Sequence, residues 1–160
     1  MEIRKIRMGM VGGGKNAFIG AVHRMAAGID GQVELCCGAL SSDPVKAKES
    51  GQLLSLPEDR IYTDFREMIL RESELPADQR MHFVSIVTPN VAHFEPAMLA
   101  LEHGFHVLLE KPMTFSLKEA ELLQQKVSET GLLLCLTYTY SAYPMVKQAR
   151  QLVREGALGD

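Results

Sequence analysis

The sequence contains no tryptophan, and only 6% of its residues are aromatic. Its 3 cysteines are too few, and too irregularly spaced, for a disulfide framework or a Cys-x-x-Cys motif. No apolar run approaches the length that crosses a bilayer, and the N-terminus lacks the apolar stretch and cleavage site of a signal peptide. These absences predict a cytoplasmic protein with reduced thiols and no membrane partner.

Neither sign of charge is in large excess. The 17 lysines and arginines and the 20 aspartates and glutamates leave a formal net charge of −3 at pH 7, which gives no reason to expect a nucleic-acid partner. The 5 histidines lack the spacing of zinc ligands, so we predict no metal site. With 46% hydrophobic and 23% charged residues, the 160-residue chain has the composition of one globular domain.

Residues 6–17, which read IRMGMVGGGKNA, are the most informative stretch. A short apolar run of strand length ends at three glycines, and apolar residues at helical spacing follow. Gly12-x-Gly14-x-x-Ala17 fits the dinucleotide-binding pattern, in which glycines allow a tight turn and close approach of a pyrophosphate, and Ala17 allows close packing of helix and strand. The start of the helix supplies N–H groups for phosphates. We therefore predict cofactor contacts from Gly12, Gly13, Gly14, Lys15, Asn16 and Ala17.

Two alternatives fit the same residues. Gly9-x-x-x-x-Gly14-Lys15 matches a P-loop up to its last position, where Asn16 replaces the hydroxyl residue that ligates magnesium. A P-loop also needs an acid at the end of a neighbouring strand, and only Glu110, which a lysine follows, could serve. The other alternative is a glycine turn without a ligand.

Strand and helix patterns alternate about six times along the chain. Apolar runs predict strands at residues 6–11, 33–40, 61–62, 83–87, 105–109 and 132–136. Helical patterns follow at residues 17–26, 44–50, 65–70, 91–103, 117–130 and 144–155, and residues 72–80 read as a polar loop. This alternation predicts an α/β fold: a doubly wound, mainly parallel Rossmann sheet of about six strands with helices on both faces.

Ligands of such sheets lie at the carboxyl ends of the strands, near the point where the strand order reverses. Three unusual strand exits are expected to converge there: the glycine turn, Thr88-Pro89-Asn90 and Glu110-Lys111-Pro112. Their convergence indicates a binding site more strongly than any one of the motifs does.

The Glu110-Lys111-Pro112 segment resembles that of the Gfo/Idh/MocA oxidoreductases, the group of glucose–fructose oxidoreductase and inositol dehydrogenase. Other matching segments occur in the family's order and spacing over essentially the whole chain: the glycine turn with His23 in the following helix, Val87-Thr88-Pro89-Asn90-x-x-His93, Ala100-Leu101-Glu102-x-Gly104-x-His106-Val107, Tyr140, Pro144 and Gly156-Ala157-Leu158-Gly159. The resemblance implies that residues 1–160 form an NAD(P)-binding Rossmann domain of a dehydrogenase.

In this family, hydride passes between NAD or NADP and a secondary alcohol of a sugar or polyol. The resemblance implies that Lys111 is the catalytic residue, near the nicotinamide and the substrate hydroxyl, where an ammonium can stabilise alkoxide charge or take part in proton transfer. For His93 a structural role bonded to backbone is at least as consistent as a cofactor contact, and His23 is expected to pack. Further cofactor contacts are expected from Thr88, Pro89, Asn90, His93, Glu110, Lys111 and Pro112.

The family usually adds a second α/β domain, which builds the substrate pocket, supplies further catalytic residues and mediates oligomerisation. That domain is absent from these 160 residues. We therefore expect the isolated chain to lack useful activity, and we expect sugar or polyol binding and homo-oligomer formation to belong to a longer parent. The alternative function is a non-catalytic NAD(P)-binding or interaction module without a complete active site.

The end of the second strand bears on the choice of cofactor. Many family members carry an acid there that binds the adenosine ribose and repels a 2′-phosphate, whereas this chain has Ser41 and Ser42. Asp43 opposes phosphate binding, and Lys46 is the nearest cation. We predict ribose contacts from Ser41 and Ser42, with weak discrimination and a slight lean to NADP over NAD.

Overall fold

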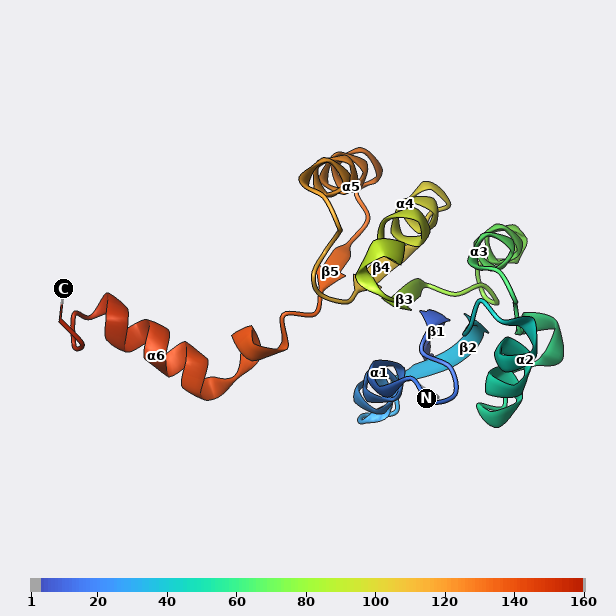
Figure 1. The fold of residues 1–160 in the computed structure, drawn as a ribbon, viewed down its shortest axis with the longest axis horizontal. Helices are drawn as coiled ribbons and strands as arrows, with labels where there is room; N and C mark the ends of the chain where they lie inside the picture. The colour runs from blue at the N-terminus through green and yellow to red at the C-terminus, as the bar shows by residue number, and fades with distance from the viewer. Residues whose placement is uncertain (1–3, 160) are drawn as a thin grey trace.

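The computed structural model describes residues 4–159, which fold around one parallel sheet (Figure 1). Its strand order is β2-β1-β3-β4-β5, so the order reverses between β1 and β3. All four strand pairs are parallel, as expected when helices connect the strands. The strands are β1 (Ile6–Gly12), β2 (Val33–Ala39), β3 (Phe83–Val87), β4 (His106–Leu109) and β5 (Leu134–Leu136).

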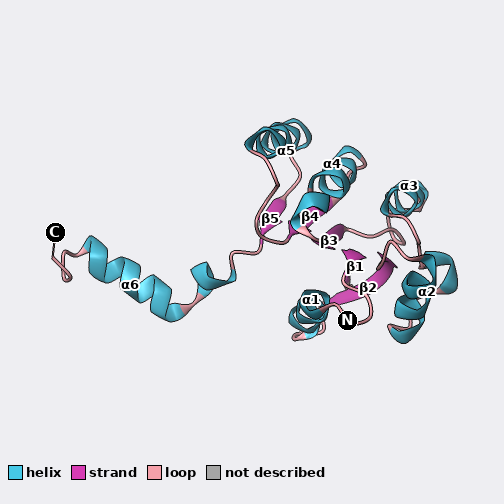
Figure 2. Ribbon diagram, in the orientation of Figure 1, coloured by secondary structure: helices cyan, strands magenta, loops and turns pink. Residues whose placement is uncertain are grey.

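Helices cover both faces of the sheet, as Figure 2 shows by colour. Helix α1 contacts β2 and β3 on one face, while α3, α4 and α5 lie side by side over the other. Helix α6 extends away from the sheet, and none of its 11 residues is buried. The helices are α1 (Phe18–Gly28), α2 (Pro44–Leu53), α3 (Phe65–Glu74), α4 (Phe94–Glu102), α5 (Leu117–Thr130) and α6 (Pro144–Arg154), with short 3₁₀ turns η1 (Glu58–Arg60), η2 (Asn90–Ala92) and η3 (Thr139–Ala142).

The predicted fold class is confirmed, with one strand reduced in size. Instead of a strand at residues 61–62, Ile61 forms a single parallel bridge with Gly38 at the free edge of β2. Only three residues separate η1 from Asp64, the N-cap of α3, so the chain has no room for a longer strand. With this bridge counted as a strand, the order becomes 3-2-1-4-5-6, which is that of the Rossmann fold.

Two differences from the sequence-based expectation are larger than the rest, in which the ends of elements shift by three residues or fewer. The predicted helix at 91–103 is divided into η2 and α4, because the chain turns at Asn90–Ala92 before Phe94 begins the α-helix. The predicted loop at 72–80 is wrong at its start, because α3 continues to Glu74. Glu72 therefore lies on a helix.

The larger part of the core lies between the sheet and the α3–α5 layer. Cys36 and Cys37 are buried free thiols, as predicted, whereas Cys135 is exposed. Among the described residues, no helix combines the length and the apolar character needed to cross a bilayer. Side chains central to the core are Ile69, Met81, Val84, Ile86, Leu101, Phe105, Leu109 and Leu123.

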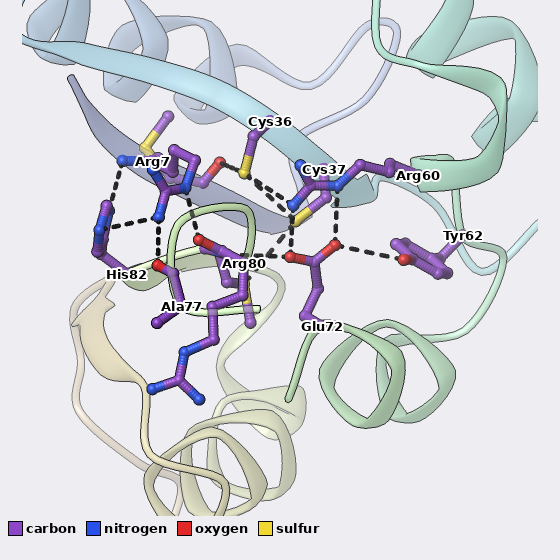
Figure 3. A network of polar contacts seen from close by, with 11 residues as sticks. Arg7, Cys36, Cys37, Arg60, Tyr62, Glu72, Ala77, Arg80 and His82 are labelled. Carbon is purple, nitrogen blue, oxygen red and sulfur yellow. Dashed lines mark hydrogen bonds and ion pairs between the residues drawn. The ribbon is translucent and has the colours of Figure 1, made fainter. Parts of the chain in front are cut away.

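Glu72 is a fully buried carboxylate at the centre of a polar network (Figure 3). It accepts two hydrogen bonds from the guanidinium of Arg60, one from the Tyr62 hydroxyl (3.3 Å) and one from the backbone N–H of Met81 (3.0 Å). Burial, and then the Glu72 carboxylate, raise the pKa of Tyr62 above its ordinary value. The network joins η1, α3 and the chain entering β3, so it fixes the edge of the domain beside β2.

We expect Glu72→Ala to lower the free energy of unfolding by about 3 kcal/mol, the lower end of the range for removing one partner of a buried ion pair. The lower end applies because the Arg60 side chain is 17% exposed and can be partly hydrated. Glu67→Ala is a matched control, because Glu67 lies on the same helix, is 46% exposed and pairs with Arg71. Its effect should stay within about 0.5 kcal/mol. Urea denaturation of both variants measures this, and equal losses would contradict the assigned role of Glu72.

Candidate functional site

The carboxyl ends of β1, β3 and β4 lie next to one another at the point where the strand order reverses. Gly12 pairs with Val87, and Ile86 pairs with Leu109. The predicted convergence of the three strand exits is therefore present in the structure. The exit of β5 joins them, because the Thr137 backbone N–H donates to the Leu109 carbonyl (3.0 Å).

The glycine turn brings backbone into close contact with β3 and α1. Gly12 and Gly13 have φ values of 79° and 73°, a left-handed conformation that glycine adopts without strain. A Cβ on Gly12 would lie 3.1 Å from Thr88 Cγ2. A Cβ on Gly13 would lie 2.8 Å from Val87 Cγ2 and 2.9 Å from Gly20 Cα. Both the backbone conformation and the lack of space therefore require glycine here.

The packing of the turn against its neighbours also requires glycine at position 14. Its Cβ would lie 2.7 Å from both the Leu40 carbonyl oxygen and Ser50 Oγ, so a side chain would collide with the exit of β2 and with α2. The hydroxyl of Ser50 also accepts a hydrogen bond from the Lys15 N–H (2.9 Å). Gly14 thus seats the turn against α2.

Gly20, which the sequence analysis did not single out, allows α1 to pack closely. Its Cβ would lie 2.4 Å from Gly13 Cα, so the helix and the turn touch through backbone alone. Close packing was predicted at Ala17, which is the N-cap of α1, and the structure shows such packing at Gly20, inside the helix. A glycine inside a helical pattern was the available signal.

The start of α1 offers backbone donors to an anion. Within the described part of the chain, no side chain caps this helix, whereas α2, α3 and α5 are capped by Asp43, Asp64 and Ser116. Uncapped N–H groups at the positive end of the helix dipole favour a phosphate. Lys15 does not complete a P-loop, because its ammonium pairs with Glu49 (3.3 Å).

Glu110 points into the protein and holds three elements together. Its Oε1 lies 3.0 Å from His23 Nε2 and accepts a hydrogen bond from Thr137 Oγ1 (2.7 Å). Its Oε2 accepts the backbone N–H of Lys111 (3.0 Å), and the other ring nitrogen of His23 lies 2.8 Å from Ser85 Oγ. Burial alone would raise the pKa of Glu110, but the hydrogen bonds from His23, Thr137 and Lys111 outweigh it and leave the pKa below its ordinary value.

Lys111 is exposed in a groove of about 1160 Å³. The groove is bounded by the exits of β3 and β4, by the first turns of α1 and by the chain that follows β5. Among the residues that the structure describes, no carboxylate lies within ion-pair distance of Lys111 Nζ. Its charge is therefore available to a ligand. The groove is lined by Phe18, Ile19, Val22, Thr88, Pro89, Asn90, Glu110, Lys111, Pro112, Thr137, Tyr138, Thr139, Tyr140, Ser141, Tyr143 and Val146.

His93 and Asn90 brace the strand exits from behind. His93 is almost fully buried, with its ring nitrogens 2.9 Å from the carbonyl oxygens of Pro112 and Thr88. The Asn90 amide, with its nitrogen facing these carbonyls, donates to Pro112 (3.0 Å) and Thr114 (3.3 Å). Of the two roles left open for His93, the geometry favours the structural one, because its polar atoms face backbone rather than the groove.

The predicted site residues do not all line one cavity. Thr88–Asn90 and Glu110–Pro112 line the large groove, whereas Gly14, Lys15, Asn16 and Ala17 line a separate hollow of about 410 Å³ between α1 and α2. Ser41 and Ser42 line neither. Ser41 Oγ instead accepts the N–H of Asp43 (3.1 Å), whose carboxylate caps α2 through the N–H groups of Val45 and Lys46.

Cys36, Cys37 and Glu72 lie within 4.8 Å of one another, the one group of possible metal ligands in the described ranges. The Arg60 guanidinium bonds Glu72 and lies 3.4 Å from Cys36 Sγ, so a protein cation already occupies the side from which the carboxylate would bind. The sequence missed this group because Glu72 fell in a predicted loop. That the chain holds no metal stays a prediction.

Comparison with known proteins identifies the family. A family model described as "Oxidoreductase family, NAD-binding Rossmann fold" matches residues 6–138, most of the chain. The chain belongs to the Gfo/Idh/MocA oxidoreductases. The predicted resemblance is confirmed, and so is the nature of the domain, an NAD-binding Rossmann domain of this family.

Three relatives illustrate the Gfo/Idh/MocA match. An uncharacterized oxidoreductase of Bacillus subtilis, YfiI, is 32% identical over 98% of this chain and 40% of its own length. An inositol dehydrogenase homolog from Azotobacter vinelandii, solved with NADH and myo-inositol, is 39% identical with a TM-score of 0.91, over 98% of this chain and 41% of that one. The NADP(+) scyllo-inositol 2-dehydrogenase IolW of Bacillus subtilis is 27% identical over 74% of this chain and 34% of its own. This chain thus spans about two-fifths of its relatives' length or less.

We expect Gly20→Ala to destabilise the domain by about 2 kcal/mol, because an added methyl group would overpack the contact with Gly13. Gly28→Ala is a matched control on the same helix, since its Cβ would meet nothing within 4 Å. Alanine there should be neutral or stabilise by up to about 1 kcal/mol. Thermal and urea denaturation measure both effects. Equal stability of the two variants would show that the approach of α1 to the glycine turn is not a constraint.

Proposed function

We propose that this chain is the cofactor-binding part of a dehydrogenase that moves hydride between NAD or NADP and a secondary alcohol of a sugar or polyol. The observation that carries the proposal is the position of Lys111. An ammonium that has no carboxylate partner among residues 4–159 lies in a groove at the switch point of a parallel sheet, where such folds bind dinucleotides. The names of the relatives, which include inositol dehydrogenases, support the substrate class.

The residues fit a dinucleotide. The positive φ angles of Gly12 and Gly13 allow the tight turn that leads into α1, and the uncapped start of this helix can donate to a pyrophosphate. In the proposal, the nicotinamide end lies in the groove beside Thr88–Asn90, and the adenosine end lies toward Ser41 and Ser42. When bound, the cofactor supplies hydride donation or acceptance.

In the proposed reaction, Lys111 Nζ acts at the substrate hydroxyl. Its positive charge stabilises the oxygen as negative charge develops there, or Nζ moves the proton to or from that oxygen. Phe18, Ile19 and Val22 form an apolar part of the groove wall, against which the flat face of the nicotinamide can pack. The Asn90 amide donates to the Pro112 carbonyl and so joins the exit of β3 to the residue that follows the lysine.

The remaining parts of the proposal concern the longer protein. We propose that a further domain, of the kind that the longer relatives have room for, completes the substrate pocket and carries any homo-oligomer contact. Substrate contacts in this chain would then be few, and the isolated chain would show no useful turnover. A cytoplasmic location stays a prediction of the sequence.

We expect the 160-residue chain to bind NADH or NADPH in isothermal titration, and we expect Lys111→Ala to leave it folded. In a longer protein that carries this domain, the same substitution should lower kcat by at least about 100-fold, the usual contribution of a positioned proton-transfer group. Lys118→Ala, an exposed lysine on α5, is the control for loss of surface charge.

Two results would count against this function. If the folded chain bound none of NAD⁺, NADH, NADP⁺ and NADPH at millimolar concentration, the proposed cofactor-binding role would be wrong. Normal kcat in Lys111→Ala, with dinucleotide binding intact, would favour the alternative, a non-catalytic NAD(P)-binding module.

We propose that the domain discriminates only weakly between NAD and NADP. The capping of α2 reduces the support for the predicted slight preference for NADP. The lean depends on Ser41, Ser42 and the N–H groups at the start of α2 as partners of a 2′-phosphate. Two of those N–H groups bond the Asp43 carboxylate instead, and this carboxylate places a negative charge beside the predicted ribose site. Relatives of both kinds are known, one bound to NADH and one named for NADP.

We expect Asp43→Asn to raise the affinity for NADPH relative to NADH by about fivefold, because asparagine still caps the helix but removes about 1 kcal/mol of repulsion. Asp64→Asn is the matched control, since Asp64 caps α3 through the same two-amide geometry, on a helix that follows a different segment. Competition titrations give both ratios. An unchanged ratio in Asp43→Asn would place the ribose elsewhere.

A further inference from the structure

A polar network at the base of the groove has no part in the proposed chemistry. His23 on α1, Ser85 on β3, and Glu110 and Thr137 at the exits of β4 and β5 are joined by hydrogen bonds. His23, Ser85 and Glu110 are buried. Buried polar groups of this kind cost free energy unless every partner is in place, so the arrangement needs a reason.

His23 is oriented from both sides. With Nε2 donating to the Glu110 carboxylate, Nδ1 is left to accept the Ser85 hydroxyl proton, and each ring nitrogen then has a partner of the right kind. The ring cannot turn without losing both bonds. The position of Glu110 Oε1 is therefore set by α1 and β3.

The same carboxylate acts on Lys111 in two ways. Its Oε2 accepts a hydrogen bond from the backbone N–H of Lys111, which fixes the backbone of that residue. Its Oε1 already accepts bonds from His23 and Thr137, so the nearest carboxylate in the sequence is turned inward. Among the residues that the structure describes, the Lys111 ammonium therefore has no carboxylate partner, and it stays available in the groove.

We infer that His23 is a positioning residue for Lys111: through Glu110 it holds the lysine backbone and keeps the adjacent carboxylate from pairing with the ammonium. This rests on the proposed function, in which Lys111 faces the nicotinamide. If His23 had only a structural role, the expected result would differ, because loosening α1 would lower the affinity of the domain for all its ligands together.

The test compares three ligands of the 160-residue chain: NAD⁺, NADH and ADP-ribose, which has no nicotinamide. An ammonium beside the ring disfavours the positively charged NAD⁺ relative to NADH. Lys111→Ala should therefore lower the ratio of the NAD⁺ to the NADH dissociation constant by about fivefold, the size of one exposed charge interaction. His23→Leu should lower the same ratio to a similar extent, while the ADP-ribose affinity stays within about twofold.

The variants also separate coupling from simple addition. In a Lys111→Ala background, His23→Leu should leave the ratio unchanged, since two residues acting through one contact are not additive. His23→Gln, which keeps an N–H donor, should restore much of the wild-type ratio. His103→Leu is the matched control, because His103 bonds only the Leu99 carbonyl of its own helix. Thr137→Val removes another donor to Glu110 and gives the same test if His23→Leu does not fold.

The failures of the two proposals are distinguishable. If Lys111→Ala shifts the ratio and both His23→Leu and Thr137→Val leave it unchanged, the positioning role is wrong and the proposed function stands. A parallel loss of NADH and ADP-ribose affinity in His23→Leu would also overturn it, in favour of a structural role. If Lys111→Ala leaves the ratio unchanged, Lys111 does not face the nicotinamide, and the proposed function itself is overturned.

Discussion

The rest of the site depends on the contact between the backbones of Gly13 and Gly20. A methyl group at either position would force α1 away from the sheet, because the available space is smaller than one carbon atom. This contact sets the distance between α1 and the sheet. His23 lies one turn further along the same helix, so the same contact brings its ring to Glu110. One backbone approach therefore aligns both the uncapped start of the helix and the base of the groove.

Two buried carboxylates have different roles, and they lie in different parts of the molecule. Glu72 is neutralised by a guanidinium and joins η1 and α3 at the edge beside β2. Glu110 lies at the strand exits and is held by neutral donors and a histidine ring. A buried charge without partners would be costly in either place. The first arrangement stabilises the fold, and the second turns the carboxylate beside Lys111 inward.

The side chains of His93 and Asn90 hold the wall of the groove by contacts with backbone carbonyl oxygens. His93 spans the carbonyl groups of Thr88 and Pro112, and Asn90 adds bonds to Pro112 and Thr114. The two strand exits therefore form one unit rather than two independent loops. A rigid wall of this kind suits a site in which small displacements of a reacting group are costly.

The sequence by itself determined those features of the fold and of the site that depend on periodicity and on local chemistry. The alternation of strands and helices, the glycine turn and the Glu110-Lys111-Pro112 exit depend on neighbours in the chain, so the sequence alone predicts them. Other features needed the tertiary structure. The partners of His23 lie 62 and 87 residues away, and the burial of Glu72 depends on Arg60 and on the chain entering β3. Gly20 matters only because Gly13 lies against it. Contacts between distant segments leave no periodic signal, and for this reason only the folded chain decided them.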